Sequence, residues 1–133
     1  MTLPEPLTNV TPALRHCWHV VATSDEVGDA PVAVRLLGEP WVLVRLDGVV
    51  HAYVDRCPHR LAPMSAGCVV DAGAGPELQC GYHGWRFAAD GACTAVPALG
   101  SDDRIPSRAR LEVPHAVTER YGLVWLAPDE PVA

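Results

Sequence analysis

The sequence of 133 residues contains no lysine, no long apolar run and few basic residues relative to acidic ones. Its ten basic residues are all arginine and are outnumbered by sixteen acidic residues, which gives a formal net charge of −6. A nucleic-acid-binding domain usually presents a clustered basic surface, so this charge balance argues against nucleic acid as a partner. We attribute the missing lysine to a GC-rich genome rather than to function.

The sequence also lacks segments that would direct the chain to a membrane. The longest apolar stretches, WVLV and GLVWLA, are far shorter than the roughly 20 residues that span a bilayer. The N-terminus MTLPEPLTNVTPALRH carries acid and proline, whereas a signal peptide has a basic start followed by an apolar run. These features predict a soluble cytoplasmic protein with no membrane partner.

Helical periodicity is missing over any segment longer than about three turns. Thirteen prolines and eleven glycines instead indicate many turns and short elements, which favours an all-β fold. Short apolar runs at 17–23, 30–38 and 41–54 predict strands, and Asp47-Gly48 predicts a hairpin turn within the third run. We expect residues 1–12 to form an N-terminal arm and residues 13–130 to form one domain.

Two further hairpins are predicted in the second half of the chain. The segment 84–97 turns at Asp90-Gly91, and 109–128 contains two strands with a turn near 120–122. Between these hairpins, 99–109 reads as a polar loop. Residues 55–84 carry little that looks regular, so the sequence predicts a small antiparallel β domain with one long irregular insertion.

That insertion contains two cysteine–histidine pairs. Cys57 and His59 are separated by one residue, and Cys80 and His83 by two. The chain has five cysteines, an odd number that argues against a pure disulfide framework. In a cytosolic protein, cysteines near histidines more often indicate a metal site than disulfides. Two such pairs so close together therefore indicate bound metal rather than chance.

Two kinds of metal site fit these residue types. Zinc binds two thiolates and two imidazoles, but its sites usually group the ligands as Cys-x₂₋₄-Cys and His-x₃₋₅-His. Here each short motif mixes one Cys with one His. A [2Fe–2S] cluster explains the mixture, because each of two loops can give a Cys to one iron and a His to the other. A zinc-binding interaction module remains the alternative.

The motifs CPH and CGYHGW resemble the Rieske iron–sulfur motif, Cys-x-His followed by Cys-x-x-His. Over residues 13–130 the chain resembles the N-terminal Rieske domain of ring-hydroxylating and demethylating non-haem iron oxygenases. The resemblance implies two small antiparallel sheets plus a cluster-binding subdomain. It also implies a Rieske-type [2Fe–2S] cluster, with Cys57 and Cys80 on the inner iron and His59 and His83 on the outer iron.

The chain departs from the high-potential Rieske proteins of respiratory complexes at four positions. Those proteins carry a disulfide where this sequence has Ala62 and Tyr82, and hydroxyl groups near the cluster sulfurs where it has Trp85 and Phe87. Hydrogen bonds to sulfur stabilise the reduced cluster. Their loss predicts a reduction potential of about −150 mV rather than about +300 mV.

The remaining cysteines and histidines carry weaker signals. Cys68 is predicted to be a spare thiol, and Cys17 and Cys93 to be buried in strands. His16 and His19 would point to opposite faces of a strand, which argues against a second metal site. Arginines flank the ligands and form either a positive collar for an acidic partner or an ordinary surface: Arg56, Arg60 and Arg86.

The resemblance implies single-electron transfer from a flavin or iron–sulfur reductase to the catalytic component of an oxygenase. Oxygenases of that family also have a catalytic domain with a 2-His-1-carboxylate iron site, and no such triad can be assembled from these residues. We therefore expect a chain that is not catalytic on its own. It is either a free electron carrier or a detached Rieske subunit or domain that feeds electrons to a separate catalytic iron.

Overall fold

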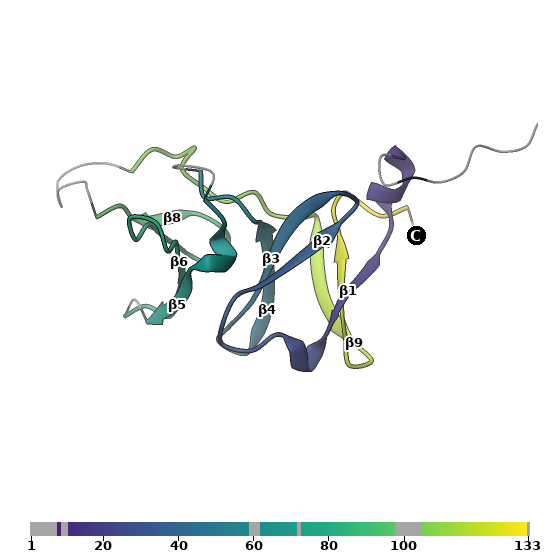
Figure 1. Cartoon of the computed structure of the whole chain (residues 1–133), viewed down its shortest axis with the longest axis horizontal. Coiled ribbons are helices and arrows are strands. Elements are labelled where there is room, and N and C mark those ends of the chain that lie inside the picture. The colour runs from purple at the N-terminus through teal and green to yellow at the C-terminus, as the bar shows by residue number, and fades with distance from the viewer. Residues whose placement is uncertain (1–7, 9–10, 59–61, 72, 98–104, 133) are drawn as a thin grey trace, which may run out of the picture.

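The computed structural model describes residues 8, 11–58, 62–71, 73–97 and 105–132. In these residues the chain forms ten strands, arranged in three antiparallel sheets. Figure 1 shows two lobes: a body with strands β1–β4, β9 and β10, and a second lobe with strands β5–β8. The predicted all-β fold is confirmed, as are two small sheets with an additional subdomain.

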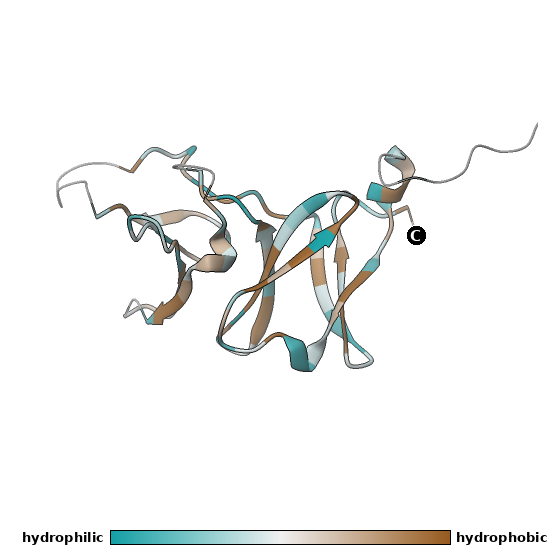
Figure 2. Cartoon of the chain, viewed as in Figure 1, coloured by the Kyte–Doolittle hydropathy of each residue, from teal (hydrophilic) through white to brown (hydrophobic). Residues whose placement is uncertain are grey.

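The body consists of two three-stranded sheets. The first has the order β1 (His19–Thr23), β10 (Leu123–Ala127), β9 (Ala116–Arg120), and the second has the order β2 (Val32–Leu36), β3 (Glu39–Leu46), β4 (Val49–Val54). Residues from both sheets share one apolar core, in which Leu43, Val124 and Leu126 have no exposed surface. In Figure 2 the strands carry most of the hydrophobic residues.

Two hairpin turns of the body are confirmed at the predicted places, whereas the turn at Leu37-Gly38 between β2 and β3 was not predicted. Asp47 and Gly48 have φ values of 53° and 81°, which is the geometry that matches the twist of the flanking strands β3 and β4. Tyr121 and Gly122, with φ values of 58° and 72°, make the same kind of turn between β9 and β10. Local turn residues are therefore sufficient to define both hairpins.

The second lobe contains a four-stranded sheet that the sequence predicted only in part. Its strands are β5 (Cys68–Asp71), β6 (Pro76–Gln79), β7 (Arg86–Phe87) and β8 (Cys93–Ala95). The predicted hairpin at Gly91 is confirmed, whereas the prediction of an irregular segment over 55–84 was wrong for β5 and β6. These four-residue strands are too short for a clear periodic signal, and Leu78, with no exposed surface, is held by contacts with distant residues.

Three short 3-10 segments complete the described structure: η1 (Pro12–His16), η2 (Ser24–Glu26) and η3 (Met64–Ala66). Strand β1 begins at His19, so Cys17 is only half-buried outside the strand, and His16 lies in η1. The strand predicted over 17–23 therefore begins two residues later than expected. His16 and His19 do not share a strand, because His16 belongs to the helical turn that begins at Pro12. No helix in the described residues is long and apolar enough to cross a membrane.

Candidate metal centre

Two loops of the second lobe are closed by the same backbone hydrogen bond. The N–H of Cys57 donates to the carbonyl oxygen of Ala62 at 2.7 Å, and the N–H of Cys80 donates to that of Trp85 at 2.7 Å. In each case a cysteine is bonded to the carbonyl five residues further along the chain. We call the segments 57–62 and 80–85 the first and second cysteine loops. Each loop begins with a cysteine whose main chain is fixed.

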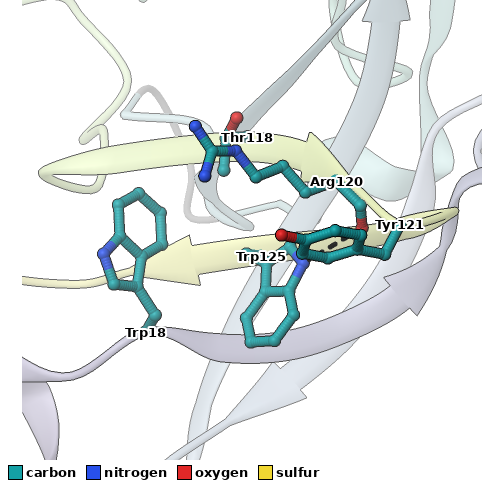
Figure 3. Close-up of a pocket in the computed structure, with 5 residues that line it drawn as sticks. All are labelled: Trp18, Thr118, Arg120, Tyr121 and Trp125. Carbon is teal, nitrogen blue, oxygen red and sulfur yellow. Dashed lines mark hydrogen bonds between the residues drawn. The ribbon is translucent and has the colours of Figure 1, made fainter.

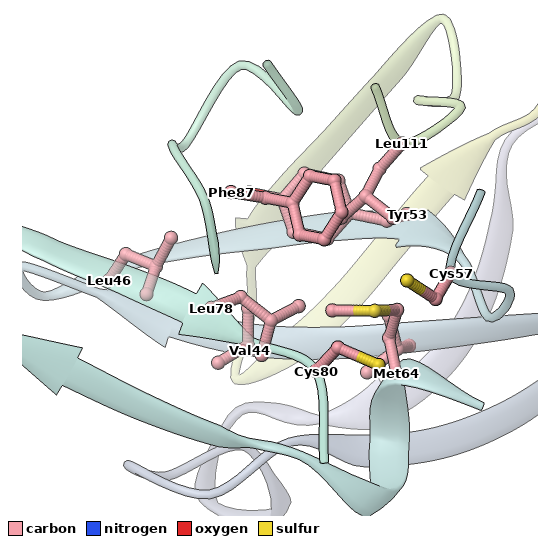
Figure 4. Packing of buried hydrophobic residues seen from close by; sticks show 10 residues of the cluster. Val44, Leu46, Tyr53, Cys57, Met64, Leu78, Cys80, Phe87 and Leu111 are labelled. Carbon is pink, nitrogen blue, oxygen red and sulfur yellow. The ribbon is translucent and has the colours of Figure 1, made fainter. Parts of the chain in front are cut away.

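The two loop cysteines are buried in one apolar cluster. Cys57 is 0% and Cys80 1% exposed, and both belong to the core cluster that contains Met64. Figure 4 shows their sulfur atoms lying near the Met64 side chain. Neither cysteine is half of a disulfide in the part of the chain that the structure describes. Two reduced thiols from separate loops are thus held where water has little access, which suits ligands to a buried iron.

The histidine of the second loop lies on the exposed side. His83 is exposed, and its ring meets the ring of Tyr82 edge-on with centroids 4.1 Å apart. His83 and Gly84 both have left-handed backbones, with φ values of 67° and 71°. This conformation is unfavourable for a non-glycine residue and is concentrated at functional sites. The loop therefore buries Cys80 and presents His83. His59 lies outside the described residues.

A backbone donor is directed at one of the thiols. The N–H of Tyr82 donates to Sγ of Cys80 at 3.4 Å. Main-chain donors of this kind stabilise the negative charge that a cysteine sulfur carries when it binds metal. Tyr82 itself is 47% exposed. The second loop thus supplies one main-chain hydrogen bond to its cysteine.

The two loops approach each other through glycine. A Cβ atom added to Gly67, just after the first loop, would lie 1.9 Å from the carbonyl oxygen of Gln79. A Cβ added to Gly81 would lie 2.8 Å from the carbonyl oxygen of Ala66. Only a residue without a side chain allows this backbone contact.

The candidate ligands in the described residues come from both cysteine loops. Within the residues that the structure describes, no three His, Cys, Asp or Glu side chains form a group that could hold one metal ion. Two buried thiols and one exposed imidazole instead come from two separate loops. That division matches a cluster with cysteines on an inner iron and histidines on an outer iron.

Residues next to the loops form an apolar support. Phe87 has no exposed surface, and Trp85 packs against the same cluster as the cysteines. The O–H of Tyr53 donates to the carbonyl oxygen of Ala89 at 2.7 Å, and burial raises the pKa of Tyr53 well above its ordinary value. Cys93 is half-buried in β8 and also packs on this cluster.

The remaining predicted residues lie outside the two loops. Cys68 is exposed in β5. Arg56 is exposed and Arg86 is half-buried, while Arg60 lies outside the described residues. Nδ1 of His16 is 2.9 Å from the carbonyl oxygen of Glu130, and Nε2 of His19 is 2.7 Å from that of Leu14, so each ring contacts the backbone.

A separate hollow of about 510 Å³ lies on the outer face of the β1–β10–β9 sheet. Figure 3 shows the five side chains that line it: Trp18, Thr118, Arg120, Tyr121 and Trp125. The indole N–H of Trp125 donates to the carbonyl oxygen of Arg120 at 3.3 Å. None of these residues belongs to a cysteine loop, so this aromatic surface is distinct from the candidate metal centre.

Comparison with known proteins agrees with this geometry. The profile of the Rieske [2Fe-2S] domain matches residues 17–115. The methylxanthine N1-demethylase NdmA of Pseudomonas putida is 42% identical over 122 residues, covering 87% of this chain and 33% of that protein. The oxygenase component of dicamba O-demethylase from Stenotrophomonas maltophilia is 39% identical, covering 89% of this chain and 33% of that protein.

A solved structure of NdmB from Pseudomonas putida CBB5 superposes with a TM-score of 0.86 at 39% identity, covering 94% of this chain and 38% of that one. Fold and paired loops together define an iron–sulfur domain of the kind found in oxygenase components. The chain belongs to the Rieske [2Fe-2S] domain family, whose cofactor is a Rieske-type [2Fe–2S] cluster. It spans about a third of the length of the curated relatives it matches.

Proposed function

We propose that this chain transfers single electrons through a [2Fe–2S] cluster held by Cys57, His59, Cys80 and His83. When bound, such a cluster accepts and releases one electron at a time. The observation that supports the proposal is the pair of identically closed loops with buried Cys57 and Cys80. The loops hold both thiols away from water, and His83 lies on the exposed side, where an electron-transfer partner can approach.

The proposed electron-transfer partners are inferred from the names of the relatives. NdmA and dicamba O-demethylase are named as a demethylase and as the oxygenase component of a demethylase. A flavin or iron–sulfur reductase is the proposed electron donor, and the catalytic component of an oxygenase is the proposed acceptor. A chain that matches only a third of such relatives can serve as a free carrier or as the Rieske portion of an oxygenase.

The primary experiment is anaerobic purification followed by iron and acid-labile sulfide analysis and by EPR after dithionite reduction. We expect two irons and two sulfides per chain and a rhombic EPR signal. Cys57→Ser and Cys80→Ser should each abolish the signal. Cys68→Ser, which changes an exposed cysteine outside the loops, is the matched control and should preserve it. A colourless protein that contains zinc would refute the proposal.

We also propose that the cluster has a reduction potential at the low end of the range for Rieske proteins. Trp85 and Phe87 lack the hydroxyl groups that would donate hydrogen bonds to sulfur, so we expect a midpoint of about −150 mV. A redox titration followed in the visible region measures it, and a midpoint well above zero would contradict this assignment. If the chain co-purifies with a larger iron protein, it is better described as part of an oxygenase than as a free electron carrier.

A further inference from the structure

Among the residues that the structure describes, Asp55 is the one buried charged residue, with 7% of its surface exposed. Aspartate is rarely buried, because removing a carboxylate from water is costly unless hydrogen bonds replace the lost hydration. Asp55 lies directly after β4 and two residues before Cys57. A buried acid beside a proposed iron ligand calls for a specific role.

Both carboxyl oxygens of Asp55 accept hydrogen bonds from a single residue. The backbone N–H of Ser65 donates to Oδ1 at 2.7 Å, and the hydroxyl of Ser65 donates to Oδ2 at 2.6 Å. The N–H of Asp55 donates in turn to the carbonyl oxygen of Pro40 at 3.0 Å. Hydrogen bonds of this length to a carboxylate are stronger than those between neutral groups. The two hydrogen bonds from Ser65 therefore join η3 to the end of β4.

These contacts enclose the first cysteine loop and reach the second. Asp55 precedes Cys57, and Ser65 follows the loop within η3, so their hydrogen bonds tie together the two ends of the segment that carries Cys57. Gly67, which follows η3, lies against Gln79, the residue before Cys80. A displacement of Ser65 would therefore be transmitted to both cysteines.

We infer that Asp55 is a positioning residue of the cluster site, which holds the two cysteine loops through Ser65 and lowers the reduction potential through its negative charge. The inference rests on the proposed function. A carboxylate two residues from Cys57 disfavours the reduced, more negative cluster, and because Asp55 is buried, water screens this effect less than it would at the surface. No cation forms an ion pair with Asp55 among the described residues.

Two substitutions test the charge of Asp55 and its hydrogen bonds with Ser65 in turn. Asp55→Asn keeps the shape and removes the charge, while Ser65→Ala keeps the charge and removes the hydroxyl donor. The matched controls are Asp25→Asn, an exposed acid that accepts from Thr23 at 2.7 Å, and Thr94→Ala, an exposed hydroxyl that donates to Glu77 at 2.7 Å. All are made in the full chain loaded with its cluster.

The readouts are the midpoint potential, the EPR g-values and the rate at which a ferrous chelator removes iron. We expect Asp55→Asn to shift the midpoint upward and to change the g-values, with Asp25→Asn unchanged. Ser65→Ala should keep the midpoint near that of the wild type and lose iron several-fold faster than Thr94→Ala. The potential shift is the result that a merely structural role would not produce.

The inference is overturned if Asp55→Asn and Ser65→Ala match their controls in all three measurements. If Asp55→Asn does not fold, the iron-loss rate of Ser65→Ala decides, and a rate equal to that of Thr94→Ala refutes the positioning role. Failure of the proposed function looks different, since the wild-type chain itself would then bind no [2Fe–2S] cluster. The two failures are therefore distinguishable.

Discussion

Gly67→Ala tests whether the close backbone contact of Gly67 with Gln79, between the segment that follows the first cysteine loop and the residue that precedes the second, is essential to the second lobe. The added Cβ would lie 1.9 Å from the carbonyl oxygen of Gln79, 3.0 Å from its carbonyl carbon and 3.1 Å from the carbonyl oxygen of Met64. All three atoms belong to the main chain, so no side-chain rotation relieves the overlap. The backbones must separate by about 1 Å, and this disturbs the neighbouring pair Cys68–Gln79 of strands β5 and β6.

The expected cost is at the upper end of the range for overpacking, about 3 kcal/mol. That is a large share of the 5–15 kcal/mol by which domains are ordinarily stable. Urea unfolding of the metal-free chain, followed by tryptophan fluorescence, measures the loss of free energy. Iron and sulfide analysis of Gly67→Ala should in addition show a large fall in cluster content, because both cysteine loops adjoin the displaced segment.

Gly28→Ala is the matched control, since a Cβ at Gly28 meets no atom within 4 Å and its φ is not left-handed. It should leave stability within about 0.5 kcal/mol of the wild type or raise it slightly, because alanine reduces the entropy of the unfolded chain. If Gly67→Ala unfolds at the same urea concentration as Gly28→Ala and retains a full cluster, the close contact between the loops is not a constraint and the reasoning fails.

Three further substitutions probe other contacts. Tyr53→Phe removes the hydrogen bond to Ala89 and should cost about 1 kcal/mol in urea unfolding. The hydrogen bond from Arg45 lowers the pKa of Glu119, so the pair stabilises the fold above the ordinary carboxyl range. Glu119→Gln should therefore be less stable at neutral pH by under about 1 kcal/mol, and the difference should vanish as the pH falls below 4.5 and through the lowered pKa. His83→Cys should lower the midpoint potential, because a thiolate restores negative charge at the cluster.

Each of these has a control in the same chain. Tyr121→Phe, at an 87% exposed tyrosine, should have no measurable effect on stability, and an equal loss in both tyrosine variants would contradict the first expectation. Glu112→Gln alters an exposed acid that forms no ion pair with another described residue, so its stability should not show this pH dependence. His115→Cys, at another exposed histidine, should leave the midpoint potential unchanged. If His83→Cys has the same midpoint potential as His115→Cys, His83 is excluded as a ligand.

Local sequence signals were sufficient to predict three of the hairpin turns and to identify the candidate site residues. The Asp47-Gly48 turn depends on two adjacent residues, and the pairing of Cys80 with His83 depends on four. Such short-range patterns are visible without knowing the fold. Four assignments as ligands remain predictions: Cys57, His59, Cys80 and His83. The division into a 1–12 arm and a 13–130 domain and the cytoplasmic location also remain predictions, and His59 and most of that arm lie outside the described residues.

Long-range contacts account for what the sequence analysis missed. Strands β5 and β6 form where Leu78 packs into a core shared with Val44 and Phe87, and four-residue strands carry little periodicity of their own. The role of Asp55 was also missed. An acid at the end of an apolar strand is an ordinary strand terminator, and only its distance to Ser65 distinguishes it.

By itself, the sequence determined the all-β class, the two Cys–His pairs and the resemblance to Rieske domains, because these depend on residue type and spacing. The tertiary structure alone decided that both cysteine loops close in the same way, that Cys57 and Cys80 are buried while His83 is exposed, and that Gly67 lies against Gln79. Those features arise where segments distant along the chain pack together, and residue spacing within one segment contains no information about that packing.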